Sequence, residues 1–170
     1  MIFVSGLSKS GKTQTIRAVI SASDLFEHVK ASELLDTAGQ PTRKLAIEQI
    51  LGNQVALIDL LANMNRDTRK IQILDGHALI ESTGGPVLLP DWVFDRLMLQ
   101  AIVQIQAEPS LISSRRAGTA MEQGQSNLEN LQRLETQHCQ YQADRLRIPF
   151  MPISHGETLL ETLMEIVRSG

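Results

Sequence analysis

A loop of eight residues near the N-terminus constrains the fold of this chain more than any other feature of its sequence. The loop follows a short apolar run at residues 1–5 and precedes residues 12–21, where apolar side chains recur at helical spacing. A strand, a glycine-containing loop and a helix in this order are typical of a Walker A phosphate-binding loop. We therefore predict that the loop binds nucleotide phosphates through Gly6, Leu7, Ser8, Lys9, Ser10, Gly11, Lys12 and Thr13.

The residue types in this loop suit the chemistry of phosphates. Gly6 and Gly11 allow backbone angles that turn successive N–H groups inward, at the positive end of the following helix. Lys12 supplies a positive charge, and Thr13 offers a hydroxyl to Mg²⁺. Asp75 ends another predicted strand and would complete the metal site. ATP and Mg²⁺ are the expected ligands, and Lys12 is an expected catalytic residue.

Length, charge and hydropathy limit the other function classes. The 170 residues fit one domain, so we expect a single domain over residues 1–170. The net charge of −3 argues against general nucleic-acid binding, which needs a clustered basic excess. Cys139 is the only cysteine, so no internal disulfide can form. No leader of signal-peptide type precedes the first strand, and no apolar run has membrane-spanning length. We therefore expect a cytoplasmic location without membrane binding. The sequence leaves open whether the protein forms an oligomer.

Five short apolar runs alternate with segments of helical character, and this alternation predicts an α/β fold with a parallel sheet covered on both faces. The expected strands are residues 1–5, 28–31, 71–74, 101–105 and 148–153, and the longest expected helices are residues 42–64 and 128–146. A capping box, Ser154 to Glu157, would open the last helix. Ligands of such folds lie beyond the carboxyl ends of the strands, so His155 and Gly156 are expected to border the nucleotide.

Residues 35–40, Leu-Asp-Thr-Ala-Gly-Gln, copy a switch motif of small GTPases, in which the glutamine orients a water molecule. Only 22 residues separate Thr13 from Asp36, too few for the elements that precede this motif in a GTPase. The chain also lacks an Asn-Lys-x-Asp motif that reads guanine. A GTPase is therefore the less favoured alternative, and we place Asp36 to Gln40 at the end of a helix.

Several segments resemble the archaeal-type adenylate kinases. The matching parts are residues 73–80, which contain Asp75-Gly76-His77, then residues 85–90, Trp92, residues 107–109, and the pair Arg115-Arg116. The resemblance implies the nucleoside monophosphate kinase form of the P-loop NTPase fold, a three-layer α/β/α arrangement with strand order 2-3-1-4-5. It also implies an acceptor-binding insertion at about residues 31–66 and a short lid at about residues 117–127.

The same resemblance implies roles for individual residues. Lys12 would hold the β- and γ-phosphates, Arg115 or Arg116 would contact the transferring phosphoryl group, and His77 would polarise a phosphate or a water molecule. Because adjacent helix positions are about 100° apart, only one of the two arginines is expected to face the phosphates. Lys30, Ser32 and Arg43 are the expected acceptor-binding residues, with Arg43 meeting an acceptor phosphate.

The expected lid departs from the family pattern, because residues 117–127 contain no arginine. Arg133, in the helix behind the lid, is the closest substitute. Two hypotheses follow. The chain is an ATP-dependent kinase that phosphorylates a nucleotide or similar small acceptor, or it is a non-catalytic ATP-binding accessory protein.

Overall fold

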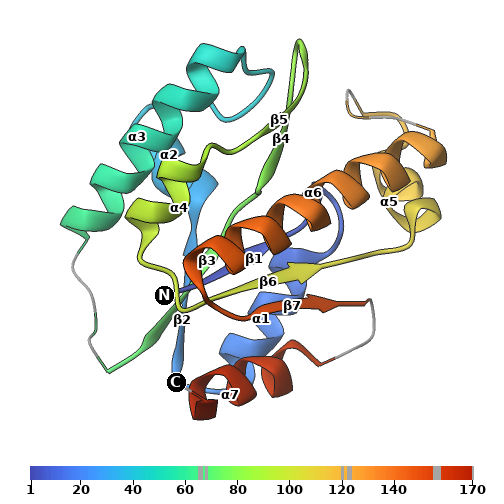
Figure 1. Ribbon diagram of the computed structural model, residues 1–170. Helices are drawn as coiled ribbons and strands as arrows, with labels where there is room; N and C mark the ends of the chain where they lie inside the picture. The colour runs from blue at the N-terminus through green and yellow to red at the C-terminus, as the bar shows by residue number, and fades with distance from the viewer. Residues whose placement is uncertain (65–66, 68, 120, 122–123, 155–157, 170) are drawn as a thin grey trace.

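A parallel β-sheet with helices on both faces forms the centre of the protein in the computed structural model, which describes residues 1–170 except 65–66, 68, 120, 122–123, 155–157 and 170 (Figure 1). The sheet has five strands in the order β2-β3-β1-β6-β7, and all neighbouring pairs are parallel. Counted along the chain within this sheet alone, the order is 2-3-1-4-5, so the predicted fold class is confirmed. The strands are β1 (Ile2–Ser5), β2 (Phe26–Lys30), β3 (Ile71–Asp75), β6 (Ala101–Ile105) and β7 (Phe150–Ile153).

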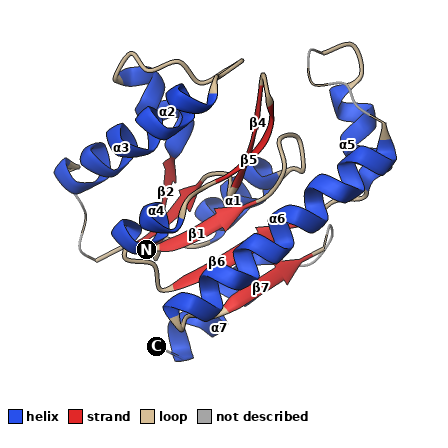
Figure 2. Cartoon of the chain, turned by 45° about the horizontal axis from the view of Figure 1, so that its top comes forward, coloured by secondary structure: helices blue, strands red, loops and turns tan. Residues whose placement is uncertain are grey.

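Helices cover the two faces of the sheet unequally (Figure 2). One face packs against α1 (Lys12–Ala22) and α7 (Leu159–Ser169). The other face carries the larger helical layer, and α5 lies beyond the carboxyl end of β6. This layer consists of α2 (Ala31–Thr37), α3 (Ile47–Asn63), α4 (Asp91–Leu97) and α6 (Gln125–Leu146), and α5 spans Pro109–Arg116.

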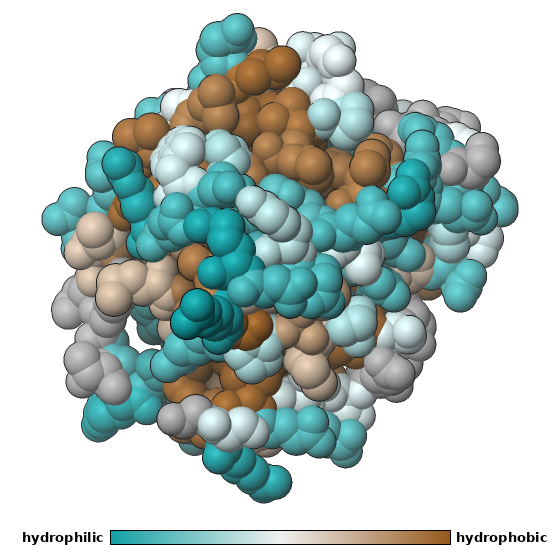
Figure 3. All heavy atoms as spheres, in the orientation of Figure 1, coloured by the Kyte–Doolittle hydropathy of each residue, from teal (hydrophilic) through white to brown (hydrophobic). Residues whose placement is uncertain are grey.

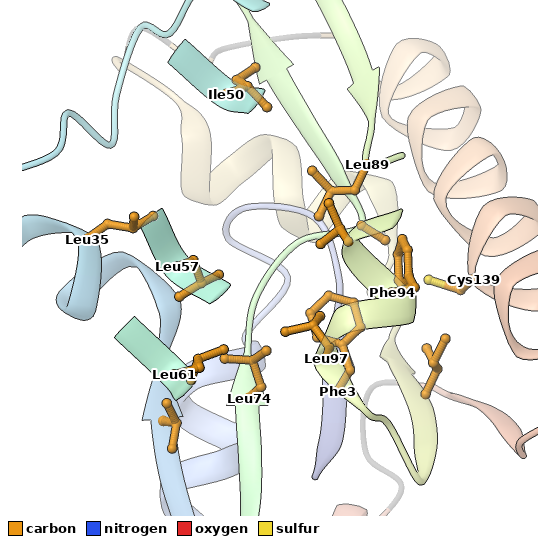
Figure 4. Packing of buried hydrophobic residues seen from close by; sticks show 14 of the residues in the cluster. Phe3, Leu35, Ile50, Leu57, Leu61, Leu74, Leu89, Phe94, Leu97 and Cys139 are labelled. Atoms are coloured by element: carbon orange, nitrogen blue, oxygen red, sulfur yellow. The ribbon is translucent and has the colours of Figure 1, made fainter. Parts of the chain in front are cut away.

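Successive side chains along each strand point to opposite faces of the sheet, so the hydrophobic core is divided between these faces. In β1, Ile2 and Val4 pack toward α1 and α7, whereas Phe3 packs toward α2, α3 and α4. Figure 4 shows this second cluster, with side chains from the sheet, α2, α3 and α4 converging. It brings α2 and α3 close to the carboxyl ends of the strands. Its labelled members include Phe3, Leu35, Leu57, Leu74, Phe94 and Leu97.

A two-stranded antiparallel ladder, β4 (Leu79–Ser82) with β5 (Gly85–Leu88), lies outside the five strands that the sequence predicts. The Gly84-Gly85-Pro86 sequence reads as a loop because proline cannot donate to a ladder. Here the ladder has only two strands, so Pro86 occupies an edge, which tolerates it. The connection is short, and Gly85 has a φ of 121° that favours glycine.

Three element boundaries differ from those predicted. Strand β2 is shifted toward the N-terminus relative to residues 28–31. Helix α3 begins at Ile47 rather than at residue 42, and the backbone N–H of Ala46 donates to Oε1 of Gln49 at its start (2.9 Å). Helix α6 begins at Gln125, so part of the expected lid is helical. Glu157, which would close the predicted capping box of α7, lies outside the described residues.

The surface contains one prominent hydrophobic area in the view of Figure 3, in the region of α3 and the β4–β5 hairpin. The exposed large hydrophobic residues of these elements are Ile47, Leu51, Val55 and Leu88. Within the described part of the chain, none of the helices combines the length and the apolar character that a membrane span requires.

Candidate active site

The loop between β1 and α1 has the backbone geometry of a phosphate cradle. Gly6 has a φ of 153° and Gly11 a φ of 101°, both in a region that side chains with a Cβ rarely adopt. A Cβ at Gly6 would also lie 2.6 Å from the carbonyl oxygen of Ile105 in the neighbouring strand. Gly6 is therefore required both by its backbone angle and by the close approach of β6.

The loop residues present fit a bound polyphosphate. The N–H of Ser10 donates to the carbonyl of Leu7 (3.0 Å), and α1 begins two residues later with Lys12, so its N-terminus faces the loop. The hydroxyl of Ser10 is buried and has no hydrogen-bond partner among the described residues. Buried polar atoms are nearly always paired, so this oxygen is available to a group bound in the loop.

Asp75, at the end of β3, gathers three side chains. Its Oδ1 lies 2.8 Å from Nζ of Lys12, and its Oδ2 accepts a hydrogen bond from Thr13 (2.8 Å) and lies 3.2 Å from Nε2 of His28. Burial alone would raise the pKa of Asp75, but the contacts with His28, Lys12 and Thr13 outweigh it and hold this pKa well below its ordinary value. Asp75 is therefore an anion at neutral pH.

This arrangement fits a magnesium ion bound together with nucleotide phosphates. The Thr13 hydroxyl and the Asp75 carboxylate are oxygen ligands of the kind that Mg²⁺ prefers, and they lie in direct contact. Their juxtaposition agrees with the predicted metal role, which stays a prediction. No sequence pattern points to His28, because its neighbour Asp75 is 47 residues away and meets it through the parallel pairing of β2 with β3.

His77 is tied to the phosphate loop. Its Nδ1 donates to the carbonyl oxygen of Gly6 (2.7 Å), so this nitrogen carries the proton and Nε2 is left as an acceptor. Burial, together with the charge of Lys12, lowers the pKa of His77 to about 3. The imidazole is therefore neutral at pH 7 and positions the loop; the predicted polarising role remains a prediction.

A buried carboxyl lies beneath the loop and was missed by the sequence analysis. Ser5 donates its hydroxyl to Oε1 of Glu135 (2.6 Å) and accepts a hydrogen bond from the N–H of Ala78 (2.9 Å). Glu135 is fully buried in α6. Burial raises the pKa of Glu135, although Ser5 and the charge of Lys12 oppose the shift. The contact joins residues 130 positions apart and fastens α6 to the start of the phosphate loop.

Replacing Glu135 with glutamine is expected to stabilise the protein at neutral pH. A carboxyl whose pKa is raised in the folded state contributes stability that is complete below its unfolded pKa of about 4.3 and is lost as the pH rises through the folded pKa. The wild-type protein should therefore lose stability relative to Glu135→Gln as the pH is raised from about 4 toward neutrality. Thermal melting across that range measures the difference. Glu129→Gln, an exposed change on the same helix, is the control, and a pH-independent difference would contradict this expectation.

The two adjacent arginines at the end of α5 have different environments. The guanidinium of Arg116 is fully buried, forms two hydrogen bonds to the Glu81 carboxylate (2.8 and 3.0 Å) and donates to the carbonyl of Ser8 (2.9 and 3.2 Å). Arg115 is partly exposed and donates to the carbonyl of Lys9 (3.0 Å). A Cβ on Gly11 would lie 3.2 Å from Nη1 of Arg115. Arg116 thus anchors the loop, and Arg115 lies over its glycine.

A cavity of about 170 Å³ opens beside the phosphate loop. The loop and the end of β3 form one side, and α2, α3 and α4 form the others, with the apolar side chains of Figure 4 among its walls. Because Lys12, Thr13 and Asp75 all line it, a molecule in this cavity would touch the residues expected to hold the phosphates and the metal.

A comparison with protein families identifies the chain. Residues 5–135 match a family model described as an AAA domain, AAA_17. This range is well over half of the chain and contains the phosphate loop, Asp75 and both arginines. The chain belongs to this AAA domain family.

The AAA domain is also similar to a solved structure, a gluconokinase from Sinorhizobium meliloti 1021. The TM-score is 0.53 and the sequence identity is 19%, over 98% of this chain and 89% of that chain. At this identity the likeness shows the fold alone. No curated protein matches the chain significantly. The family and the fold support a P-loop kinase architecture, but neither is specific to the archaeal-type adenylate kinases that the sequence resembles.

The expected acceptor-binding residues of the AAA domain are only partly brought together. Lys30 and Ser32 line the cavity. Arg43 is exposed and does not line it, so the expected contact of Arg43 with an acceptor phosphate in this cavity has no support. Arg133 is exposed on α6 and donates to Asn130 (2.7 Å). The expected nucleotide-bordering residues His155 and Gly156, and part of the expected lid, lie outside the described residues.

Proposed function

We propose that this AAA domain is an ATP-dependent kinase that phosphorylates a small molecule. The observation that carries the proposal is the cavity beside the phosphate loop, because Lys12, Thr13 and Asp75 border it directly. Phosphoryl transfer needs mainly correct positioning and cations placed around the transferring group. A site that binds ATP without transferring phosphate does not need a cavity for another molecule beside the phosphate loop.

The chain's own residues supply the parts of this mechanism. Bound Mg²⁺ would neutralise phosphate charge, with Thr13 and Asp75 as its protein ligands. Lys12 would exchange its contact with Asp75 for the β- and γ-phosphates, and the N–H groups at the start of α1 would bind the β-phosphate. Arg115 would contact the transferring phosphoryl group, while the apolar cavity walls keep water from it.

The resemblance to adenylate kinases implies a nucleotide or similar small acceptor. Lys30 and Ser32 support an acceptor site between β2 and α3, because both line the cavity. Among the described residues no arginine lines the cavity, which does not favour an acceptor that carries a phosphate. A non-catalytic ATP-binding protein is the main alternative, and a GTPase is a weaker one, since Asp36 and Gln40 lie at the carboxyl end of α2 as predicted.

Asp75→Asn is expected to lower the rate of phosphate transfer by about 100-fold or more, because the metal loses its carboxylate ligand. Gln40→Leu should leave the rate nearly unchanged, since Gln40 lies at a helix end. The measurement follows radiolabelled γ-phosphate from ATP, and separately from GTP, onto nucleoside and deoxynucleoside monophosphates and onto neutral alcohols.

Two outcomes would reject the kinase proposal. Tight Mg-ATP binding without transfer to any acceptor would support the accessory-protein alternative. A preference for GTP, with its hydrolysis abolished by Gln40→Leu, would show that residues 35–40 act as a switch motif after all.

A further inference from the structure

Two cationic side chains, Lys12 and Lys30, line the cavity beside the phosphate loop among the described residues. Lys12 pairs with Asp75 (2.8 Å) and is needed for the ATP phosphates. Lys30 is partly exposed and forms a surface pair with the mostly exposed Glu33 (2.7 Å). Neither Arg115 nor Arg116 lines the cavity. An acceptor phosphate would therefore meet one lysine and no arginine, which is costly because a buried double charge requires fuller pairing.

Most of the cavity wall is apolar. Aliphatic side chains from α2, α3, α4 and the segments around the β4–β5 hairpin form this part of the wall, and include Leu35, Leu45, Leu57, Ile80, Leu89 and Leu97. A cavity of roughly 150 Å³ holds a molecule the size of benzene. The volume of about 170 Å³ therefore suits a compact body with an apolar surface.

Two side-chain amides of α3 present hydrogen-bond acceptors in this wall. Nδ2 of Asn53 donates to the carbonyl of Pro41 (2.6 Å), and Nε2 of Gln54 donates to the carbonyl of Ile50 (3.2 Å). A backbone carbonyl can only accept, so these contacts fix which end of each amide is nitrogen. The side chains are only 3% and 4% exposed and line the cavity, and no hydrogen bond to the oxygens Oδ1 and Oε1 is seen among the described residues.

Unpaired amide oxygens discriminate between ligand classes. A hydroxyl group can donate a hydrogen bond to them, whereas a phosphate or carboxylate oxygen at neutral pH offers lone pairs and repels them. Because a polar group that a bound ligand shields from water is costly when it stays unpaired, a ligand that pairs with Asn53 and Gln54 gains over one that cannot.

We propose that the acceptor is an uncharged, compact alcohol with at least two hydroxyl groups and an apolar body, not a nucleoside monophosphate. One hydroxyl lies toward Asp75 and Lys12 and receives the phosphate, and another donates to Asn53 or Gln54. This inference rests on the proposed kinase function and specifies its acceptor.

The transfer balances without a further reactant. The acceptor oxygen forms a bond to the γ-phosphorus of ATP while the bond from that phosphorus to the bridging oxygen breaks. ADP leaves with that oxygen, and the hydroxyl proton passes to water. The product is a phosphate monoester of the alcohol.

A matched pair of ligands tests the acceptor class. Hydroxybenzyl alcohol and hydroxybenzoate have similar size, but the second carries a carboxylate in place of a neutral hydroxymethyl group. Binding of each compound, and of AMP, is measured by calorimetry on the full chain saturated with Mg-ADP. We expect the alcohol to bind about ten-fold or more tightly than the carboxylate, and AMP to bind more weakly than the alcohol.

Variants of α3 locate the binding site. Asn53→Ala and Gln54→Ala should each weaken binding of hydroxybenzyl alcohol by about ten-fold, with Mg-ATP affinity unchanged. Asn63→Ala is the matched control, because Nδ2 of Asn63 donates to a backbone carbonyl one turn earlier (2.8 Å), as Gln54 does, but Asn63 does not line the cavity. Retained Mg-ATP affinity shows that a variant is folded.

The outcomes separate this inference from the proposed function. Stronger binding of AMP or hydroxybenzoate than of the alcohol, or an alcohol affinity that neither α3 variant changes, overturns the neutral-alcohol acceptor. If phosphate is then transferred to a nucleoside monophosphate, the kinase proposal stands without this acceptor. If Mg-ATP does not bind at all, the kinase proposal itself fails.

Discussion

Lys12→Ala is expected to abolish most of the rise in melting temperature that Mg-ATP gives the wild-type protein. A ligand selective for the folded state stabilises it by RT ln(1 + [L]/Kd), about 2.7 kcal/mol at a hundred-fold excess over Kd. Lys12 is almost fully buried next to Asp75 and is the cation closest to the expected phosphate position. Its loss leaves the backbone N–H groups of the loop as the main phosphate ligands.

The readout for this variant has to be the ligand-induced shift, not the absolute melting temperature. Lys12→Ala also leaves the buried Asp75 carboxylate with only His28 and Thr13, so the free protein is expected to melt lower as well. Arg17→Gln is the matched control, because it removes an exposed positive charge from α1 outside the phosphate loop. An unchanged Mg-ATP shift in Lys12→Ala, on protein free of bound nucleotide, would show that the loop does not bind phosphate as inferred.

Sequence reasoning succeeded where the determining interactions are local. The phosphate loop is specified by glycines at two of its three positions with positive φ, the third being Lys9, directly after an apolar strand and before an amphipathic helix. The parallel sheet follows from alternating strands and helices. Asp75 could be placed near Lys12 because the carboxyl ends of parallel strands lie at the same edge of a sheet.

Contacts between distant segments could not be derived from the sequence. The bond between Ser5 and Glu135, and that between Ser8 and Arg116, join residues more than a hundred positions apart, and no local pattern marks them. Glu135 reads as one polar residue in a polar helix, although its side chain is fully buried. The β4–β5 hairpin, which supplies Glu81 to Arg116, was hidden by its Gly-Gly-Pro sequence.

Residues in the predicted acceptor region illustrate the same limit. Arg43 has the right charge for an acceptor phosphate, and its sequence position is close to Thr42, which lines the cavity. Its side chain is nevertheless exposed, because the segment before α3 is not the helix that we predicted. Asn53 and Gln54 read as ordinary polar residues of an amphipathic helix. Only the position of α3 against the sheet shows that they face a cavity.

Arg116→Ala is expected to destabilise the protein strongly. The change removes the guanidinium that pairs with the Glu81 carboxylate, which is only 15% exposed, and that donates to the carbonyl of Ser8. Breaking such a buried pair costs about 3–5 kcal/mol, which corresponds to a fall of roughly 10 °C in melting temperature for a domain of this size. The sequence analysis predicted that only one arginine of the pair faces the phosphates. The buried contacts of Arg116 with Glu81 and Ser8 indicate that its role is to hold the loop.

Arg115→Ala is expected to have the opposite effect, with little change in melting temperature and a fall in kcat of about 100-fold or more. The guanidinium of Arg115 lies next to Gly11 and is held only by the carbonyl of Lys9 in the described structure, so it is free to turn toward the transferring phosphoryl group. A contact that strengthens mainly in the transition state lowers kcat with little effect on ATP affinity. Single-turnover kinetics and thermal melting of both variants and of Glu81→Gln separate the catalytic role of Arg115 from the anchoring role of Arg116.

Full activity of Arg115→Ala would show that Arg115 does not contact the transferring phosphoryl group. Equal stability of Arg116→Ala and wild type would show that the Glu81 pair does not anchor the loop.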